Sequence, residues 1–204
     1  MRLLRIFLLL ALIASLQACI SAPPMKPAES ALTKALYEKH QQKIATIHQF
    51  TLQGRIGVQT EGKGFSGSLN WQHDKANDEV SLFSPLGGQV ASIKKTSNQV
   101  TLIDDKGNSI SEADAETLTQ KTLGWKLPLA GLSDWSLGRP TSNTIQASKW
   151  DEQGHLSTLK QDGWEIEYQN YIALNGYVLP SKIVLRNEKV NLKLLIERWE
   201  NLSN

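Results

Sequence analysis

Few side chains in this sequence have the type and spacing needed to catalyse a reaction or hold a metal ion. The four histidines have no metal-ligand spacing to one another or to the single cysteine; they are His40, His48, His73 and His155. The sequence contains no G-x-S-x-G nucleophile turn, no H-E-x-x-H pair and no glycine-rich phosphate loop. It therefore predicts a protein without a metal site, a cofactor, catalytic residues or enzymatic activity.

Two carboxylate pairs are the remaining candidates for acid/base chemistry. Glu165 and Glu167 share one face of a predicted strand, so they could form such a pair. Apolar Trp164, Ile166 and Tyr168 alternate with them, which favours a solvated outer face for the glutamates. The aspartates at residues 104–105 fall in a predicted turn, where a solvated hairpin tip is the simpler interpretation.

The first eighteen residues have the composition of a secretory signal. Arg2 and Arg5 precede an apolar run over residues 6–16, and the small residue Ala18 follows it. The run is shorter than the about 20 residues that cross a bilayer. We therefore expect residues 1–18 to be a cleaved signal peptide.

Cys19 is the only cysteine, so it has no partner for an internal disulfide. A free thiol is one interpretation. The other comes from the tetrapeptide at residues 16–19, LQAC, which resembles the bacterial lipobox. That resemblance implies cleavage before Cys19 and a fatty-acyl anchor, such as palmitate, on the new amino terminus. Because no aspartate follows Cys19, it also implies the outer membrane.

The rest of the chain suits one folded domain on a short tether. Residues 19–29 are rich in proline and small residues, as in an extended linker, and residues 30–204 form the predicted domain. The whole chain has 22 Lys and Arg against 20 Asp and Glu, and loss of Arg2 and Arg5 makes it formally neutral. Without a block of basic residues, no nucleic-acid partner is expected.

Hydrophobic periodicity predicts a helix from residue 30 and then a sheet. After the helix, apolar residues recur at every second position, which is typical of half-buried antiparallel strands. We expect eleven strands, over residues 49–60, 64–73, 78–84, 89–95, 98–104, 108–110, 144–150, 155–161, 164–170, 177–186 and 189–200. Pro180 should make its strand an edge strand or a bulged one. This is an α+β, mainly antiparallel fold, curled into an incomplete, half-open barrel.

Two short helices should interrupt the strands. The first is expected to begin at Ser111 in a capping-box-like S-E-A-D segment and to end at Gly124. The second is short and apolar, with Pro128 at its first position. Together with the six tryptophans, these helices could belong to an ordinary core or form the lid of an apolar cavity for acyl chains.

The segment FSPLGG at residues 83–88 should be a hairpin turn, since Pro85 presets φ and glycines such as Gly87 reach positive φ. Leu86 at its tip has no local structural role. Single exposed leucines are common, so this one could be without meaning.

Several segments together make the chain similar to the LolB family of outer-membrane lipoproteins. They are LQAC at 16–19, GRIGV at 54–58, LNW at 69–71, SPLG at 84–87, VTLIDDKG at 100–107 and LGWKLPL at 123–129, followed by Leu132, Trp135, Leu137 and Gly138. Ser84 stands where the family often has asparagine, and both residues suit the start of a turn.

The resemblance implies a function and a set of residues. The protein would accept acylated lipoproteins from a soluble periplasmic carrier similar to LolA and insert them among outer-membrane lipids, without nucleotide hydrolysis, acting as a monomer. Leu86, with Pro85 and Gly87, would form the membrane-delivery loop. The expected cavity wall and lid are Trp71, Leu82, Leu118, Trp125, Leu129, Leu132 and Trp135. The alternative is an anchored structural or assembly lipoprotein of an envelope complex, with a solid core.

Overall fold

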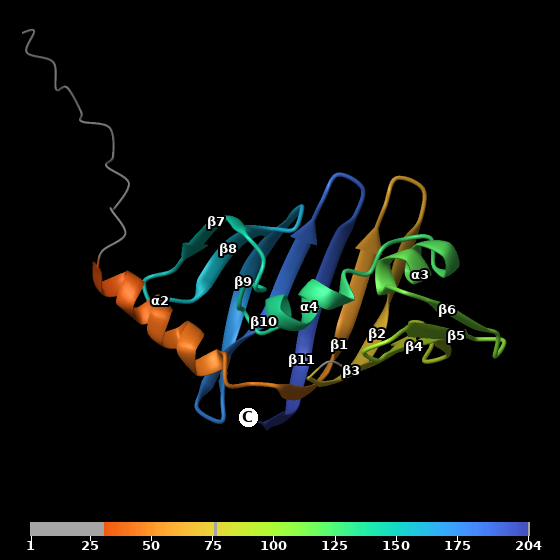
Figure 1. Cartoon of the computed structure of the whole chain (residues 1–204), viewed down its shortest axis with the longest axis horizontal. Helices are drawn as coiled ribbons and strands as arrows, with labels where there is room; N and C mark the ends of the chain where they lie inside the picture. Colours follow the sequence, from red (N-terminus) through yellow and green to blue (C-terminus); the bar gives the residue numbers. More distant parts are fainter. Residues whose placement is uncertain (1–30, 76, 204) are drawn as a thin grey trace, which may run out of the picture. The chain divides into compact units, whose positions relative to one another are not determined.

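A computed structural model describes residues 31–75 and 77–203. The predicted signal peptide, Cys19 and the predicted tether lie outside the described residues. Within the described residues, eleven strands form one sheet in the order β6-β5-β4-β3-β2-β1-β11-β10-β9-β8-β7, in which every neighbouring pair is antiparallel (Figure 1).

The strands and helices follow one another with short connections. The strands are β1 Gln49–Gln59, β2 Gly64–Asp74, β3 Asn77–Phe83, β4 Gln89–Lys95, β5 Val100–Asp104, β6 Ser109–Glu112, β7 Ile145–Trp150, β8 Leu156–Gln161, β9 Trp164–Leu174, β10 Tyr177–Arg186 and β11 Asn191–Ser203. The helices are α2 Ala31–Ile44, α3 Ala115–Thr122 and α4 Leu129–Ser136. The predicted number and antiparallel pairing of the strands are confirmed.

The sheet is not closed, because β6 and β7 stand at its two ends and do not pair with each other. The segment that joins them carries α3 and α4, so the chain must cross from one edge of the sheet to the other. Figure 1 shows both helices on one face of the sheet. The predicted half-open arrangement is therefore confirmed.

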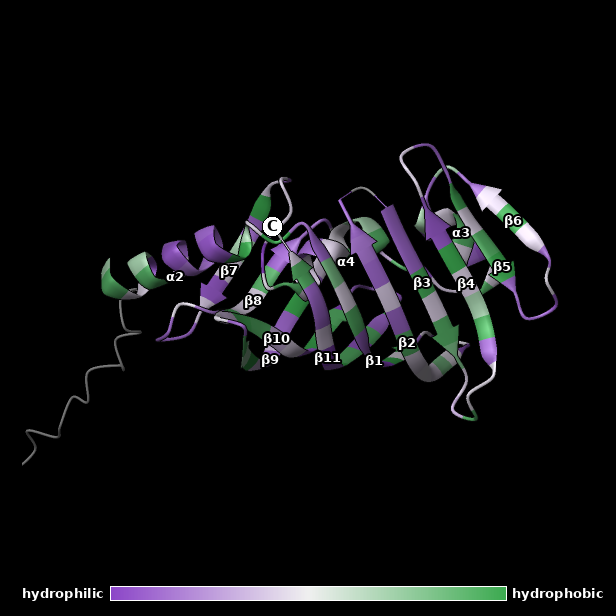
Figure 2. Cartoon of the chain, turned by 90° about the horizontal axis from the view of Figure 1, so that it is seen from below, coloured by the Kyte–Doolittle hydropathy of each residue, from purple (hydrophilic) through white to green (hydrophobic). Residues whose placement is uncertain are grey.

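Alternation along the strands defines the face that the helices cover. In β1 the residues at even positions are buried, among them Phe50 and Leu52. Leu52 stands opposite Trp71 of β2 and opposite Trp199 of β11, so the three buried side chains lie in one row across the sheet. Figure 2 shows the same alternation as hydrophobic and hydrophilic bands along the strands.

Helix α3 begins later than the sequence predicted. Ser111 stays in β6, where its hydroxyl lies 2.8 Å from that of Thr101 on β5. The N-cap is Asp114, whose carboxylate accepts the Thr117 N–H at 2.8 Å. The predicted start at Ser111 was wrong because Ser111 pairs with Thr101 of β5 as part of strand β6. Gly124 does follow the helix, at φ +83°, and its N–H donates to the Thr119 carbonyl.

Two proline predictions are corrected in part. Strand β10 lies between β9 and β11, so it is not an edge strand. Its pairing with β9 shifts register between Pro180 and Lys182, which confirms the alternative of a bulge. Pro128 is the residue before α4 rather than its first residue, with ψ +58°.

Candidate functional site

The seven residues predicted to form a cavity wall and lid lie together in one buried cluster. None is more than 3 % exposed, and they come from β2, β3, α3, α4 and the segment between the two helices: Trp71, Leu82, Leu118, Trp125, Leu129, Leu132 and Trp135. In this structure α4 therefore closes against the sheet, and its apolar side chains are part of a continuous core.

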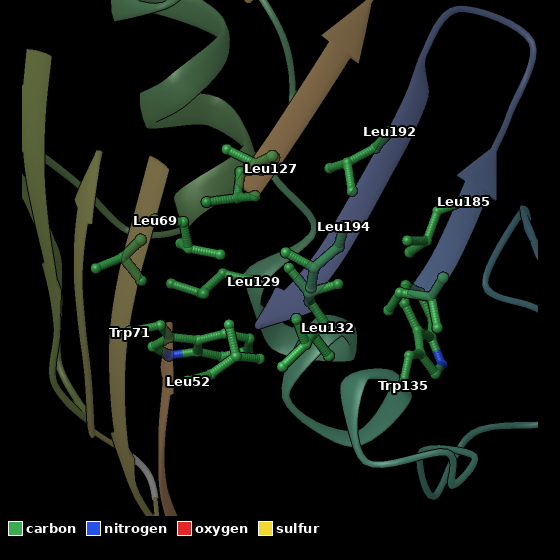
Figure 3. Packing of buried hydrophobic residues seen from close by; sticks show 14 of the residues in the cluster. Leu52, Leu69, Trp71, Leu127, Leu129, Leu132, Trp135, Leu185, Leu192 and Leu194 are labelled. Atoms are coloured by element: carbon green, nitrogen blue, oxygen red, sulfur yellow. The ribbon is translucent and has the colours of Figure 1, made fainter. Parts of the chain in front are cut away.

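Helix α4 supplies the centre of this cluster. Figure 3 shows Leu129 directed toward Trp71 and Leu132 beside Leu194 of β11. The spacing of three residues along a helix places Leu129, Leu132 and Trp135 on one face, which is the face that is buried. This helix has no side-chain cap at its N-terminus, so packing is what holds it there.

One buried hydrogen bond also ties α4 to the sheet. The Trp135 indole N–H donates to the side-chain oxygen of Gln161 on β8 at 3.0 Å. Gln161 is fully buried, accepts the Thr141 N–H and donates to the Asn143 carbonyl, so its amide is well satisfied. The sequence offered no signal for Gln161, since its partners are 18 to 26 residues away.

A pocket of about 370 Å³ lies beside the lid, at the ends of β3 and β4. Leu82 and Trp125 of the predicted set line it; the other lining residues are Lys63, Gly64, Phe65, Val90, Thr122 and Leu123. The rings of Phe65 and Trp125 stack there with centroids 6.4 Å apart. Most of this wall is apolar, so the pocket can take a hydrocarbon group.

The turn between β3 and β4 projects Leu86 into solvent. The Ser84 N–H donates to the Gly88 carbonyl at 2.7 Å, and the Gly87 N–H donates to the Ser84 carbonyl at 2.9 Å. Gly87 has φ +86°, a conformation that favours glycine. Leu86 is 99 % exposed. The predicted turn and the position of Leu86 at its tip are confirmed.

A buried charged cluster at the other end of these strands was not predicted. The carboxylate of Asp78 on β3 accepts the Trp71 indole N–H at 2.8 Å and lies 2.7 Å from Nδ1 of His73 and 3.1 Å from Nζ of Lys95. Burial alone would raise the pKa of Asp78, but the hydrogen bond from His73 and the charge of Lys95 outweigh it and lower that pKa. The cluster fixes the indole of Trp71.

The candidate acid/base pair faces solvent, as expected from its apolar neighbours. Glu165 pairs with Lys160 and Glu167 with Arg186. Hydrogen bonds from Gln169 and Arg186 lower the pKa of Glu167. Within residues 31–75 and 77–203, no group of three or more His, Cys, Asp or Glu side chains could hold a metal ion. Nor does any helix in that part of the chain have the length and apolarity to cross a membrane.

Comparisons with known proteins agree with one another. The sequence matches the family described as "Outer membrane lipoprotein LolB" over residues 48–199. An outer-membrane lipoprotein LolB of Nitrosomonas europaea is 37% identical over 74% of this chain and 72% of its own length. Its counterpart from Pseudomonas fluorescens is 30% identical over 96% of both chains.

A solved structure shows the same fold at low identity. The LolA superfamily protein from Nitrosomonas europaea superposes with a TM-score of 0.53 and 10% identity, over 86% of this chain and 95% of its own. The sequence match spans most of the domain, including the turn that carries Leu86 and the helices that cover the sheet. The chain belongs to the LolB family of outer-membrane lipoproteins.

Proposed function

We propose that this outer-membrane lipoprotein accepts the acyl chains of other lipoproteins between α4 and the sheet and then releases them into the outer membrane at the Leu86 turn. The family is one of lipoprotein-localisation proteins and not of enzymes. The donor would be a soluble periplasmic carrier similar to LolA, and the protein would act as a monomer.

The observation that carries this proposal is the position of Leu86. An ordered turn holds a fully exposed leucine at the end of β3 and β4, and the same two strands contribute Leu82 and Val90 to the apolar pocket beside the lid. A hydrocarbon chain leaving that pocket would pass next to the leucine. Because Leu86 is almost fully exposed, its whole side chain is available to a membrane.

The energetics explain why a protein is needed and why nucleotide hydrolysis is not. A buried methylene is worth about 0.8 kcal/mol, so exposing one long acyl chain to water costs roughly 10 kcal/mol or more. A protein interior of similar apolarity removes most of that cost. Direction can then come from a modest rise in affinity from carrier to receptor to membrane.

Acceptance requires α4 to move, since its leucines fill the interior in this structure. The helix has only eight residues and its N-terminus lacks a side-chain cap, so packing and the Trp135–Gln161 hydrogen bond are the main interactions that oppose the motion. Acyl chains can replace Leu129 and Leu132 as neighbours of Trp71 and Leu194, exchanging one apolar contact for another.

A second candidate is the structural or assembly lipoprotein with a solid core. The observation in its favour is that all seven predicted cavity residues are buried in one continuous cluster. Such a protein would bind no acyl chain, and its α4 would have only a structural role.

Binding of a fluorescent acyl probe to the unanchored domain, together with uptake of a lipoprotein from the soluble carrier, separates the two. We expect the domain to bind the probe and Leu132→Glu to reduce both readouts, because a carboxylate resists contact with hydrocarbon. Ala130→Glu is the matched control, because Ala130 lies on the exposed side of the same helix.

Leu132→Ala covers the case in which the glutamate variant does not fold. If Leu132→Glu unfolds and folded Leu132→Ala binds the probe like the parent, Leu132 belongs to a solid core. That result, or a parent domain that binds no probe, would refute acceptance at α4.

A further inference from the structure

Tyr168 carries a polar group in the apolar interior that has no partner. It lies on the inner face of β9, alternates with buried Trp164 and Ile166, and is only 6 % exposed. Its hydroxyl oxygen is buried, and no hydrogen-bond partner for it exists in the described part of the chain. An unpaired buried hydroxyl costs free energy, so its retention calls for a reason.

Two other hydroxyls, those of Tyr171 and Thr119, do have partners. The Tyr171 hydroxyl donates to the Leu156 carbonyl at 2.8 Å, although the rings of Tyr168 and Tyr171 are only 6.1 Å apart. The Thr119 hydroxyl donates to the Ala115 carbonyl at 2.7 Å and accepts the Leu127 N–H at 2.9 Å. Among the described residues, Nδ1 of His40 and the indole N–H of Trp150 are also buried without a partner, so Tyr168 is one of several unpaired groups. It differs from Tyr171 in having a hydroxyl that is free to donate.

The surroundings keep this hydroxyl protonated. Burial raises the pKa of Tyr168 far above its usual value, and Tyr37 of α2 and Asp134 of α4 raise it further. The Asp134 carboxylate is engaged by Arg139 at 2.6 Å. The hydroxyl is thus a neutral donor, and its residue belongs to the same buried cluster as Leu132 and Trp135 of α4.

Open space adjoins this tyrosine. It borders a groove of about 640 Å³ between β8, β9 and β10, together with Leu156, Tyr171 and Ile172. Tyr168 therefore lies at the border between the apolar interior and this groove.

We propose that the Tyr168 hydroxyl donates a hydrogen bond to the ester carbonyl oxygen of a bound acyl group. This rests on the proposed function, since it assumes that acyl chains enter the interior. The chemistry is matched: an ester carbonyl is an acceptor joined to hydrocarbon, and the site offers a neutral hydroxyl donor within an apolar wall. Tyr168 would then hold the acyl linkage while the chains contact the leucines.

The experiment compares a synthetic tripalmitoylated cysteine peptide with its ether-linked analogue, which keeps the chains and lacks the ester carbonyls. We expect the parent domain to prefer the ester peptide by roughly two- to tenfold, the effect of about one hydrogen bond. Tyr168→Phe should lose that preference while binding the ether analogue unchanged. Its midpoint of urea unfolding should not fall, because the removed hydroxyl has no partner to lose.

Tyr171→Phe is the matched control. It removes a hydroxyl that already has a partner, so it should lower the unfolding midpoint and keep the ester preference. Diacyl phosphatidylethanolamine and its diether form make a second pair. If the domain prefers the ester form only in the phospholipid pair, the carbonyl that Tyr168 binds belongs to a membrane lipid. That result would overturn the proposal that it belongs to a lipoprotein.

Two results would refute this inference and leave the proposed function intact. One is equal binding of the ester and ether peptides by the parent domain, and the other is an ester preference that persists in Tyr168→Phe. A parent domain that binds neither peptide would instead refute the acceptance of acyl chains.

Discussion

Leu86 can act at the membrane surface at little entropic cost, because its turn is already ordered by two backbone hydrogen bonds. Inserting a leucine fully into hydrocarbon is worth about 1.5 to 3 kcal/mol, or roughly tenfold or more in engagement. We expect Leu86→Glu to leave the unfolding midpoint and carrier-to-receptor transfer near those of the parent, and to reduce delivery into liposomes by about that factor. A liposome transfer assay with a radiolabelled lipoprotein measures the last step.

Leu195→Glu is the control, because it places the same charge at another exposed leucine of the domain. Leu195 of β11 is 42 % exposed and lies on the sheet, away from the turn at residues 84–88. The Leu195→Glu variant should deliver the lipoprotein as well as the parent. If Leu86→Glu delivers the lipoprotein as well as the parent, Leu86 is an exposed leucine without a role in delivery.

The Asp78 cluster predicts a pH-dependent stability. The carboxylate has a lowered pKa in the folded state, so its contribution is complete above the unfolded pKa of about 4 and is lost as the pH falls through the folded pKa. Asp78→Asn should cost about 2 to 4 kcal/mol at pH 7, because it weakens a buried charged network. Urea unfolding at pH 7 and pH 3 should show the difference from the parent shrinking at the lower pH.

Asp74→Asn is the comparison for that experiment, since Asp74 lies exposed at the end of β2. It should change stability by less than about 0.5 kcal/mol at either pH. A cost for Asp78→Asn that stays constant between pH 7 and pH 3 would show that the cluster does not depend on the charge.

Single residues differed in how far the sequence could predict them. Leu86 was predictable because proline and glycine define its turn locally. Asp78 and Tyr168 were not, since their environments depend on which strands lie beside β3 and β9 and on which helices cover them. Alternation assigned Tyr168 to the buried face, but it could not say that its hydroxyl would lack a partner there.

At the scale of the element, a substitution at Gly131 tests how tightly the Trp135 ring packs against the backbone of α4. Alanine is usually favoured over glycine in a helix by about 1 kcal/mol. Here a Cβ at residue 131 would lie 2.6 Å from the Trp135 ring, whose indole is fixed by Gln161. We expect Gly131→Ala to destabilise the domain by about 1 to 3 kcal/mol, measured by urea unfolding.

Gly57→Ala serves as its counterpart, because no atom lies within 4 Å of the added Cβ. It should be neutral within about 0.5 kcal/mol. If Gly131→Ala stabilises the domain instead, Trp135 must be free to move, and α4 would be looser than its packing indicates.

Local sequence patterns were enough to predict where the strands lie, but strand pairing determined the start of α3 and the environment of Pro180. Alternation located the strands, most of which have one buried face, although the edge strands β6 and β7 contain no buried residue. The start of α3 was misplaced because Ser111 suits a cap by type, yet β5 pairs with it first. Pro180 predicted an edge strand or a bulge, and the sheet accommodates it in an interior strand through a shift of register against β9.

At the scale of the molecule, strand order explains why helices cover the interior. Strands β1 and β11 pair at the centre of the sheet, which leaves β6 and β7 at its two edges, and the chain between these edges must cross the apolar face. Periodicity predicted helices in that segment but could not give the order of the strands. The lid is thus a consequence of topology as much as of its own sequence.

The last prediction concerns the relation between the anchor and the body. If Cys19 carries the lipid, mass spectrometry of the mature protein should find it as a modified amino terminus, and Cys19→Ala behind another cleavable signal should give an unanchored protein. The interior and the Leu86 turn lie within residues 31–203, so this variant should still accept a lipoprotein from the carrier at the parent's level. Delivery should slow, because the turn must then find the membrane by diffusion instead of being held near it. Loss of acceptance in a folded Cys19→Ala protein would mean that the anchor takes part in binding cargo, and an unmodified thiol in the mature protein would return Cys19 to the interpretation of a free cysteine.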